Sequence, residues 1–110
     1  MSGASRRLTP FELRERIERG DDLQLVDVRE PEEWAIGHLP GSVLIPRGEL
    51  MARRDELDPE RPVVCICHHG IRSAHAAAVL AAHGFCDVRD LAGGLERWAI
   101  DVDPEFPRYG

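Results

Sequence analysis

Short apolar runs alternate along the chain with longer segments of mixed polarity, and this spacing predicts strands followed by helices. The predicted strands are residues 23–27, 43–45, 63–66 and 88–91. The predicted helices are residues 9–20, 31–36, 49–57, 74–83 and 95–100, and residues 101–110 are predicted to be an irregular tail. Strands that alternate with helices usually pair in parallel and are covered by helices on both faces. The pattern therefore predicts an α/β fold with a mainly parallel sheet.

The first predicted helix carries signals at both of its ends. Thr9 can cap the N-terminus, Pro10 suits the first helical position, and Glu12 completes a capping box. Gly20 can end the helix in a left-handed conformation. This helix is expected to be part of the scaffold.

The most informative stretch runs from the apolar strand that begins at Val63 into the Ala-rich helix predicted at 74–83. Cys67 is the first residue after the strand, and Gly70 lies in the polar turn before the helix. A helix N-terminus offers unpaired N–H groups and a positive partial charge, so anions such as a thiolate are stabilised there. Ligands bind beyond the carboxyl ends of strands in sheets of this kind, and Asp27 also lies at a strand end. Cys67 is therefore the candidate centre of the chemistry.

Composition narrows the function. The chain has 110 residues, a net charge of −6 and 20 acidic residues against 14 basic ones, all of them arginine. This balance argues against a nucleic-acid partner, and the lack of lysine excludes Schiff-base chemistry. No stretch approaches the roughly 20 apolar residues of a membrane span, and the start does not resemble a signal peptide. Three cysteines, an odd number without a secretion signal, argue against a disulfide framework, so a reduced, cytoplasmic setting is expected.

Three groups of residues, in order along the chain, resemble the signatures of rhodanese-like domains. They are Leu25-Val26-Asp27-Val28-Arg29-Glu30-Pro31-Glu32-Glu33-Trp34 with Gly37-His38-Leu39-Pro40-Gly41-Ser42 and Ile45-Pro46, then Cys67-His68-His69-Gly70-Ile71-Arg72-Ser73, and finally Leu91-Ala92-Gly93-Gly94 with Trp98. The tail, through Pro107-Arg108-Tyr109, resembles the ends of free-standing rhodanese domains and of those fused to ubiquitin-activating-like sulfur-carrier enzymes. The resemblance implies a three-layer α/β/α fold in a single domain, 1–110, with its core at about 8–100.

The resemblance also implies a sulfurtransferase. In that family a cysteine thiolate takes the outer sulfur of a donor such as thiosulfate, becomes a persulfide, and passes the sulfur to a thiol or to cyanide. Cys67 would be the nucleophile, and His68, His69, Gly70, Ile71, Arg72 and Ser73 would form the loop that binds the persulfide and the substrate. Arg72 would add positive charge, and Asp27 with Arg29 would support the loop. The expected partners are a thiosulfate-like donor and a thiol acceptor, including a protein sulfur carrier, with no cofactor and no metal.

Several alternatives stay open at this point. Four residues separate Cys67 from Arg72, one fewer than in the related phosphatase loop, and the narrower ring favours sulfur over a phosphoryl group or arsenate. A partner-dependent sulfur-relay or sensor module is a second alternative. Asp27 and Arg29 could form only an ion pair or a helix cap. Zinc is disfavoured because its ligands usually come in spaced pairs.

Other residues receive structural or surface roles. His68 and His69 are expected to point outward at the rim, partly cationic near neutrality, where they would attract an anionic donor. Cys65 is expected in the core on the same strand side as Cys67, and Cys86 at the surface. The remaining assignments are core or covering positions for Trp34 and Trp98, a backbone hydrogen bond for His38, packing or solvent positions for His75 and His83, and solvated surface for Asp21-Asp22 and Glu32-Glu33.

Overall fold

The computed structural model describes residues 6–110 and contains one sheet of parallel strands. The strands are β1 (Arg6–Leu8), β2 (Gln24–Asp27), β3 (Val43–Leu44), β4 (Val63–Ile66) and β5 (Val88–Leu91). Their order across the sheet is β1-β5-β4-β2-β3, which places β4 at the centre. The four strands expected from the sequence are confirmed. The non-sequential order brings the carboxyl ends of β4 and β2 side by side, with Asp27 opposite Ile66.

The helices follow the expected pattern with local differences. They are α1 (Pro10–Glu18), α2 (Pro31–Ile36), α3 (Leu50–Arg53), α4 (Ile71–Ala82) and α5 (Gly94–Asp101), and two 3₁₀ turns, Arg47–Glu49 and Arg54–Glu56, flank α3. The single helix expected at 49–57 is therefore wrong in detail, because 3₁₀ turns lie on either side of one short α-helical segment. Helix α4 begins earlier than predicted, directly after Gly70, so Arg72 and Ser73 belong to its first turn.

The expected ends of α1 are confirmed. The Thr9 hydroxyl accepts a hydrogen bond from the Glu12 N–H at 3.1 Å, and the Glu12 carboxylate accepts one from the Thr9 N–H at 2.8 Å. Gly20 follows the helix with a φ of 81°, in the left-handed region that glycine adopts most easily. Short-range signals thus account for this helix.

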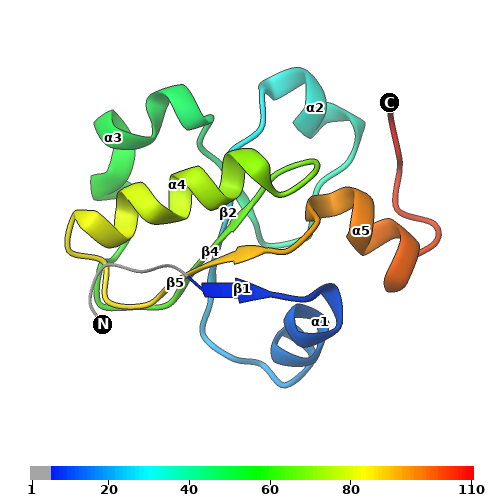
Figure 1. The fold of residues 1–110 in the computed structure, drawn as a ribbon, viewed down its shortest axis with the longest axis horizontal. Coiled ribbons are helices and arrows are strands. Elements are labelled where there is room, and N and C mark those ends of the chain that lie inside the picture. Colours follow the sequence, from blue (N-terminus) through cyan, green and yellow to red (C-terminus); the bar gives the residue numbers. More distant parts are fainter. Residues whose placement is uncertain (1–5) are drawn as a thin grey trace.

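The sheet separates two apolar cores, because successive residues of a strand point to opposite faces. In β4 and its extension, Val63, Cys65 and Cys67 belong to the core under α3 and α4, whereas Val64 and Ile66 belong to the core under α1 and α5. Figure 1 shows α3 and α4 on one side of the sheet and α1 on the other. The expected three-layer α/β/α fold is confirmed.

Strand β1 was not predicted from the sequence. Its Arg-Arg-Leu sequence has too little apolar character to indicate a strand, and it forms by pairing with β5, Arg6 opposite Arg89 and Leu8 opposite Leu91. Leu8 is buried in the core under α1 and α5. This edge strand depends on tertiary pairing rather than on a local pattern.

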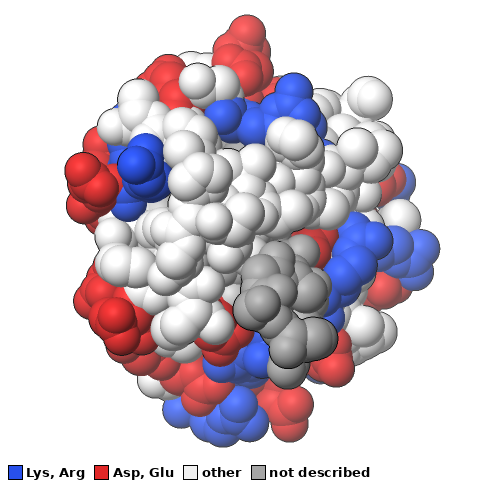
Figure 2. Space-filling model, turned by 60° about the vertical axis from the view of Figure 1, so that its left-hand side comes forward, with Lys and Arg blue, Asp and Glu red and all other residues white. Residues whose placement is uncertain are grey.

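Charged side chains surround an uncharged area on the face that carries α3 and the C-terminal half of α4 (Figure 2). Arg72 is the only charged residue of α4, whose exposed positions include Ile71, His75, Ala78 and Ala82. None of the helices within residues 6–110 has both the length and the apolar character needed to cross a lipid bilayer.

Candidate active site

Cys67 lies where the central strand meets the N-terminus of α4. Its Sγ accepts hydrogen bonds from two backbone N–H groups, that of Gly70 at 3.1 Å and that of Ser73 at 3.2 Å. The thiol S–H can donate to the Ser73 hydroxyl, whose Oγ is 3.3 Å away. Cys67 is 1% exposed, so these donors act on a sulfur shielded from bulk water. The loop thus surrounds the sulfur with the donors that a thiolate needs.

Gly70 makes this turn of the loop possible. Its φ is 93°, and a Cβ at this position would lie 2.9 Å from the Gly93 nitrogen and 3.0 Å from Nη2 of Arg7. The left-handed conformation and the close packing both require a residue without a side chain. Gly70 therefore allows the loop to turn back toward the Cys67 sulfur.

Helix α5 supports the loop from the other side of the sheet. The Leu95 N–H donates to the Cys67 carbonyl at 2.8 Å, and the Glu96 N–H donates to the His68 carbonyl at 3.0 Å. Gly94 permits this approach, because a Cβ there would lie 2.4 Å from the His68 carbonyl oxygen. The Gly93-Gly94 pair therefore lets the N-terminus of α5 join the thiol loop.

Arg7, on β1, is a further support that the sequence did not indicate. Its guanidinium donates to the Gly70 carbonyl at 3.2 Å and to the Asp90 carboxylate at 3.2 Å. Asp90 is buried, and burial raises its pKa. One side chain thereby links the thiol loop to a buried acid on β5.

Arg72 does not extend a free guanidinium toward the sulfur. It forms two parallel hydrogen bonds with the Glu33 carboxylate, at 2.6 and 2.8 Å. The interpretation of Glu33 as solvated surface is wrong, because its side chain is only 17% exposed and the Arg72 guanidinium lowers its pKa to about 2. The positive charge expected from Arg72 is therefore balanced by a carboxylate from α2.

Asp27 and Arg29 form a buried ion pair beside the loop. Arg29 is fully buried and donates from Nε and Nη2 to the Asp27 carboxylate, at distances from 2.8 to 3.1 Å. Nη2 also donates to the Gly37 carbonyl at 2.7 Å. Arg29 therefore connects the end of β2 to the turn after α2, and support of the loop by this pair stays a prediction.

The two histidines of the loop differ in environment. His69 is exposed, as expected for a rim residue, but His68 is only 6% exposed. Burial lowers the pKa of His68, and neither ring nitrogen has a hydrogen-bond partner within residues 6–110. The expectation that His68 points outward and carries partial positive charge is wrong, because the Tyr109 ring stacks on it at 3.9 Å between centroids.

Tyr109 is the main site residue that sequence reasoning missed. Its hydroxyl donates to the Glu33 carboxylate at 2.7 Å and accepts from Nη1 of Arg29 at 3.1 Å. The tail expected to be irregular has turns after α5, and its Phe106 is buried in the core under α1 and α5. The two aromatic residues of this tail, Phe106 and Tyr109, were the signal in the sequence that the segment packs against the domain.

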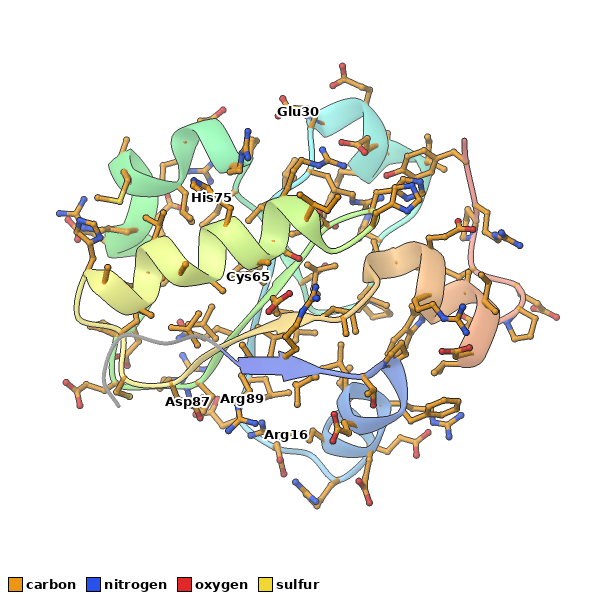
Figure 3. The ribbon with its side chains drawn as sticks, viewed as in Figure 1. Arg16, Glu30, Cys65, His75, Asp87 and Arg89 are labelled. Atoms are coloured by element: carbon orange, nitrogen blue, oxygen red, sulfur yellow. The ribbon has the colours of Figure 1, made fainter. Side chains whose placement is uncertain are left out.

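Cys65, Cys86, His38 and His75 have the environments expected from the sequence. Cys65 is buried beneath α4 (Figure 3), and burial raises its pKa. Cys86 is exposed. His38 Nδ1 lies 3.0 Å from the Trp34 carbonyl oxygen, and the two rings stack. Figure 3 also shows His75 on the side of α4 that faces α3. No group of three or more His, Cys, Asp or Glu side chains within the described part of the chain could hold a metal ion.

The fold and the site together define a class of protein: three-layer α/β/α domains with a buried cysteine in an amide-lined loop after the central parallel strand. The chain belongs to the rhodanese-like domain family, whose sequence profile matches residues 9–101.

Relatives within this family cover most of the chain. It is 38% identical over 98 residues to thiosulfate sulfurtransferase GlpE of Pseudomonas paraeruginosa, a match that covers 89% of this chain and 87% of that protein. It is 40% identical over 107 residues to the probable adenylyltransferase/sulfurtransferase MoeZ of Mycobacterium tuberculosis, covering 93% of this chain but only 26% of that protein. The chain thus spans about a quarter of the mycobacterial relative.

A solved structure shows the same fold. The rhodanese-related protein of Thermoplasma volcanium superposes with a TM-score of 0.80 at 32% identity, over 88% of this chain and 93% of that one. The family expected from the three signatures is therefore confirmed.

Proposed function

We propose that this protein is a sulfurtransferase that carries sulfane sulfur as a persulfide on Cys67. The observation that carries the proposal is the pair of backbone N–H groups, from Gly70 and Ser73, that point at the Cys67 sulfur within 3.2 Å. Backbone amides stabilise an anion without introducing a competing nucleophile. They can serve both the thiolate and the persulfide anion that replaces it.

The transfer takes place in two displacements at sulfur. The Cys67 thiolate attacks the outer sulfur of thiosulfate, the S–S bond of the donor breaks, and sulfite leaves with the electron pair. An acceptor thiolate, or cyanide, then attacks the outer sulfur of the persulfide. The bond between the two sulfurs of the persulfide breaks, and its electron pair returns to Sγ as the thiolate.

A hollow beside the loop offers a place for the donor and the acceptor. It has a volume of about 470 Å³ and is lined by His69, Glu96, Arg108, Tyr109 and Gly110. His69 is exposed on its wall and can meet an anionic donor, whereas Arg108 is paired with Glu96. The exposed imidazole and the paired charges of this lining suit a small anion such as thiosulfate.

The test is the intact mass of the protein after incubation with thiosulfate. We expect wild type to gain the mass of one sulfur atom, which dithiothreitol releases, and Cys67→Ser to gain none. Cys86→Ser is the matched control, because it removes an exposed thiol outside the site and should leave the adduct intact. An adduct that survives in Cys67→Ser would contradict the proposal.

Turnover separates the proposal from its rivals. Transfer from thiosulfate to cyanide or dithiothreitol supports a sulfurtransferase that uses small acceptors. An adduct without turnover on small acceptors favours a relay that needs a protein acceptor. Absence of an adduct together with hydrolysis of a phosphate ester would favour a phosphatase and overturn the proposal.

A further inference from the structure

Tyr109 contacts three residues of the site at once, although it lies in the tail after α5. Its ring stacks on His68, with centroids 3.9 Å apart and planes 13° apart. Its hydroxyl lies between two charged groups, donating to Glu33 at 2.7 Å and accepting from Arg29 at 3.1 Å. Within the described range 6–110, no other side chain is hydrogen-bonded to both the Asp27–Arg29 pair and the Glu33–Arg72 pair.

These contacts hold the thiol loop at both of its ends. His68 directly follows Cys67, so a fixed His68 ring fixes the first peptide groups of the loop. Arg72 directly precedes Ser73, whose N–H donates to the sulfur at 3.2 Å. Both oxygens of Glu33 bind Arg72, and Oε2 also accepts the Tyr109 hydroxyl, so the phenol is tied to that end of the loop through one carboxylate.

The Tyr109 ring covers one face of the buried side chain of His68. The two ring nitrogens of His68 are buried without hydrogen-bond partners in the described part of the chain, which disfavours the position unless packing compensates. The stacked phenol supplies that packing on one face of the imidazole. Without Tyr109, the His68 ring would be free to turn toward water and bring its peptide group with it.

We propose that Tyr109 is a positioning residue for sulfur transfer: it clamps His68 and the Arg72–Glu33 pair so that the Gly70 and Ser73 amides stay directed at the Cys67 sulfur. The inference rests on the proposed function and deepens it, because it assigns to the tail a part in presenting the sulfur. Tyr109 does not touch the reacting atoms and acts through the loop.

The docked position of the tail can be measured without any substrate. Tyr109 is the single tyrosine of the chain, so alkaline titration of ultraviolet absorbance reports on this side chain alone. Burial and the Glu33 carboxylate raise the pKa of Tyr109 above its usual value of 10.0, and the nearby Arg29 opposes that change. We expect a midpoint above that of free tyrosine in wild type, and a midpoint near the free value would show that the tail is not docked.

Two substitutions then separate the ring from the hydroxyl. Tyr109→Phe keeps the stacked ring but loses both hydrogen bonds, and Tyr109→Ala loses ring and hydroxyl. We expect kcat/KM to fall about tenfold in the first variant and about a hundredfold in the second, by analogy with lost hydrogen bonds to charged groups. Glu105→Ala, an exposed position in the same tail, is the control and should match wild type.

The kinetic pattern distinguishes positioning from simple stability or donor binding. Because one loop serves both displacements, kcat/KM should fall by the same factor for thiosulfate and for the acceptor. The pH profile of Cys67 alkylation by iodoacetamide, measured in the Cys86→Ser background, should move upward in Tyr109→Ala because the thiolate loses donors. Loss of stability alone would lower the melting temperature but leave kcat/KM and the alkylation profile of the folded protein unchanged.

The outcomes keep the two proposals apart. Equal kinetics and equal alkylation profiles in wild type, Tyr109→Phe and Tyr109→Ala would overturn the role of Tyr109, while a wild-type persulfide adduct would still support sulfur transfer. If wild type forms no adduct, the proposed function fails, and the alkylation profile alone decides whether Tyr109 positions the loop. A fall in kcat/KM for thiosulfate alone, with kcat/KM for the acceptor unchanged, would show that Tyr109 binds the donor and would also overturn the positioning role.

Discussion

Replacement of Gly70 by alanine tests the geometry of the thiol loop directly. Gly70 has a φ of 93° and supplies one of the two N–H groups that reach the Cys67 sulfur. An added Cβ would lie 2.9 Å from the Gly93 nitrogen, which belongs to backbone and cannot rotate away. The loop must therefore shift, and the Gly70 N–H turns from the sulfur when it does.

The magnitude follows from two contributions. The left-handed conformation costs an alanine about 1–2 kcal/mol, and overpacking against fixed backbone adds about 1–3 kcal/mol. We expect Gly70→Ala to lose about 2–5 kcal/mol of stability in total. Loss of one preorganised amide donor should lower kcat about 100-fold or more.

Gly84→Ala is a matched control for this substitution. Gly84 has nearly the same φ, 91°, but an added Cβ would have nothing within 4 Å. This variant therefore carries only the conformational cost of about 1–2 kcal/mol, which at this chain length lowers the melting temperature by about 4 °C per kcal/mol. Its transfer activity at 25 °C should equal that of wild type.

The assays are thermal unfolding by circular dichroism and steady-state transfer from thiosulfate to cyanide, with the persulfide adduct read by intact mass. If Gly70→Ala were folded and retained activity within about twofold, the N–H groups of this loop would not stabilise the reacting sulfur. Equal losses of activity in the Gly70 and Gly84 variants would show that conformational strain alone explains the effect.

Three further predictions concern the supports of the site. Asp27→Ala leaves Arg29 buried without its carboxylate partner, so the free energy of unfolding in urea should fall by about 3–5 kcal/mol. The double variant Asp27→Ala with Arg29→Met should recover part of this loss, and no recovery would show that the loss does not come from the unpaired charge of Arg29. Glu33→Gln removes a carboxylate whose pKa lies below its unfolded value, at about 2, because of Arg72. The stabilisation from this carboxylate is therefore complete above about pH 4.5 and is lost as the pH falls toward 2. At pH 7 the free energy of unfolding of Glu33→Gln should be about 2 kcal/mol below that of wild type, after allowance for partial exposure, and this difference should shrink through that pH window. A difference independent of pH would refute the prediction. Phe106→Ala should cost about 3 kcal/mol in the same unfolding assay, because it leaves a cavity under α1 and α5, and a loss below about 1 kcal/mol would mean that the tail is not anchored there.

Local patterns predicted most of the scaffold and the centre of the site. The capping residues of α1, the apolar runs of the strands and the cysteine at a strand end all act within a few residues of the chain. Cys67 and Gly70 could be identified because strand, thiol, glycine and helix follow one another directly. The strand-end position also indicated Asp27, and the resemblance to a family added Arg29 and the role of the pair.

The missed features all depend on contacts between distant segments. Glu33 was read as surface because its partner, Arg72, lies 39 positions further along the chain. His68 was placed at the rim because the ring that buries it, Tyr109, belongs to a tail without a regular pattern. Neither pairing leaves a periodic signal in the sequence, so both required the fold.

The position of β1 at the sheet edge beside β5 has a consequence for how the site is assembled during synthesis. Arg6 pairs with Arg89, and Arg7 reaches Gly70 from that strand, so β1 can add to the sheet only after β5 has been synthesised. Such long-range pairings form late, because loop closure must precede them. In a nascent chain the loop around Cys67 therefore lacks the Arg7 contact until β5 has been synthesised and has paired with β1.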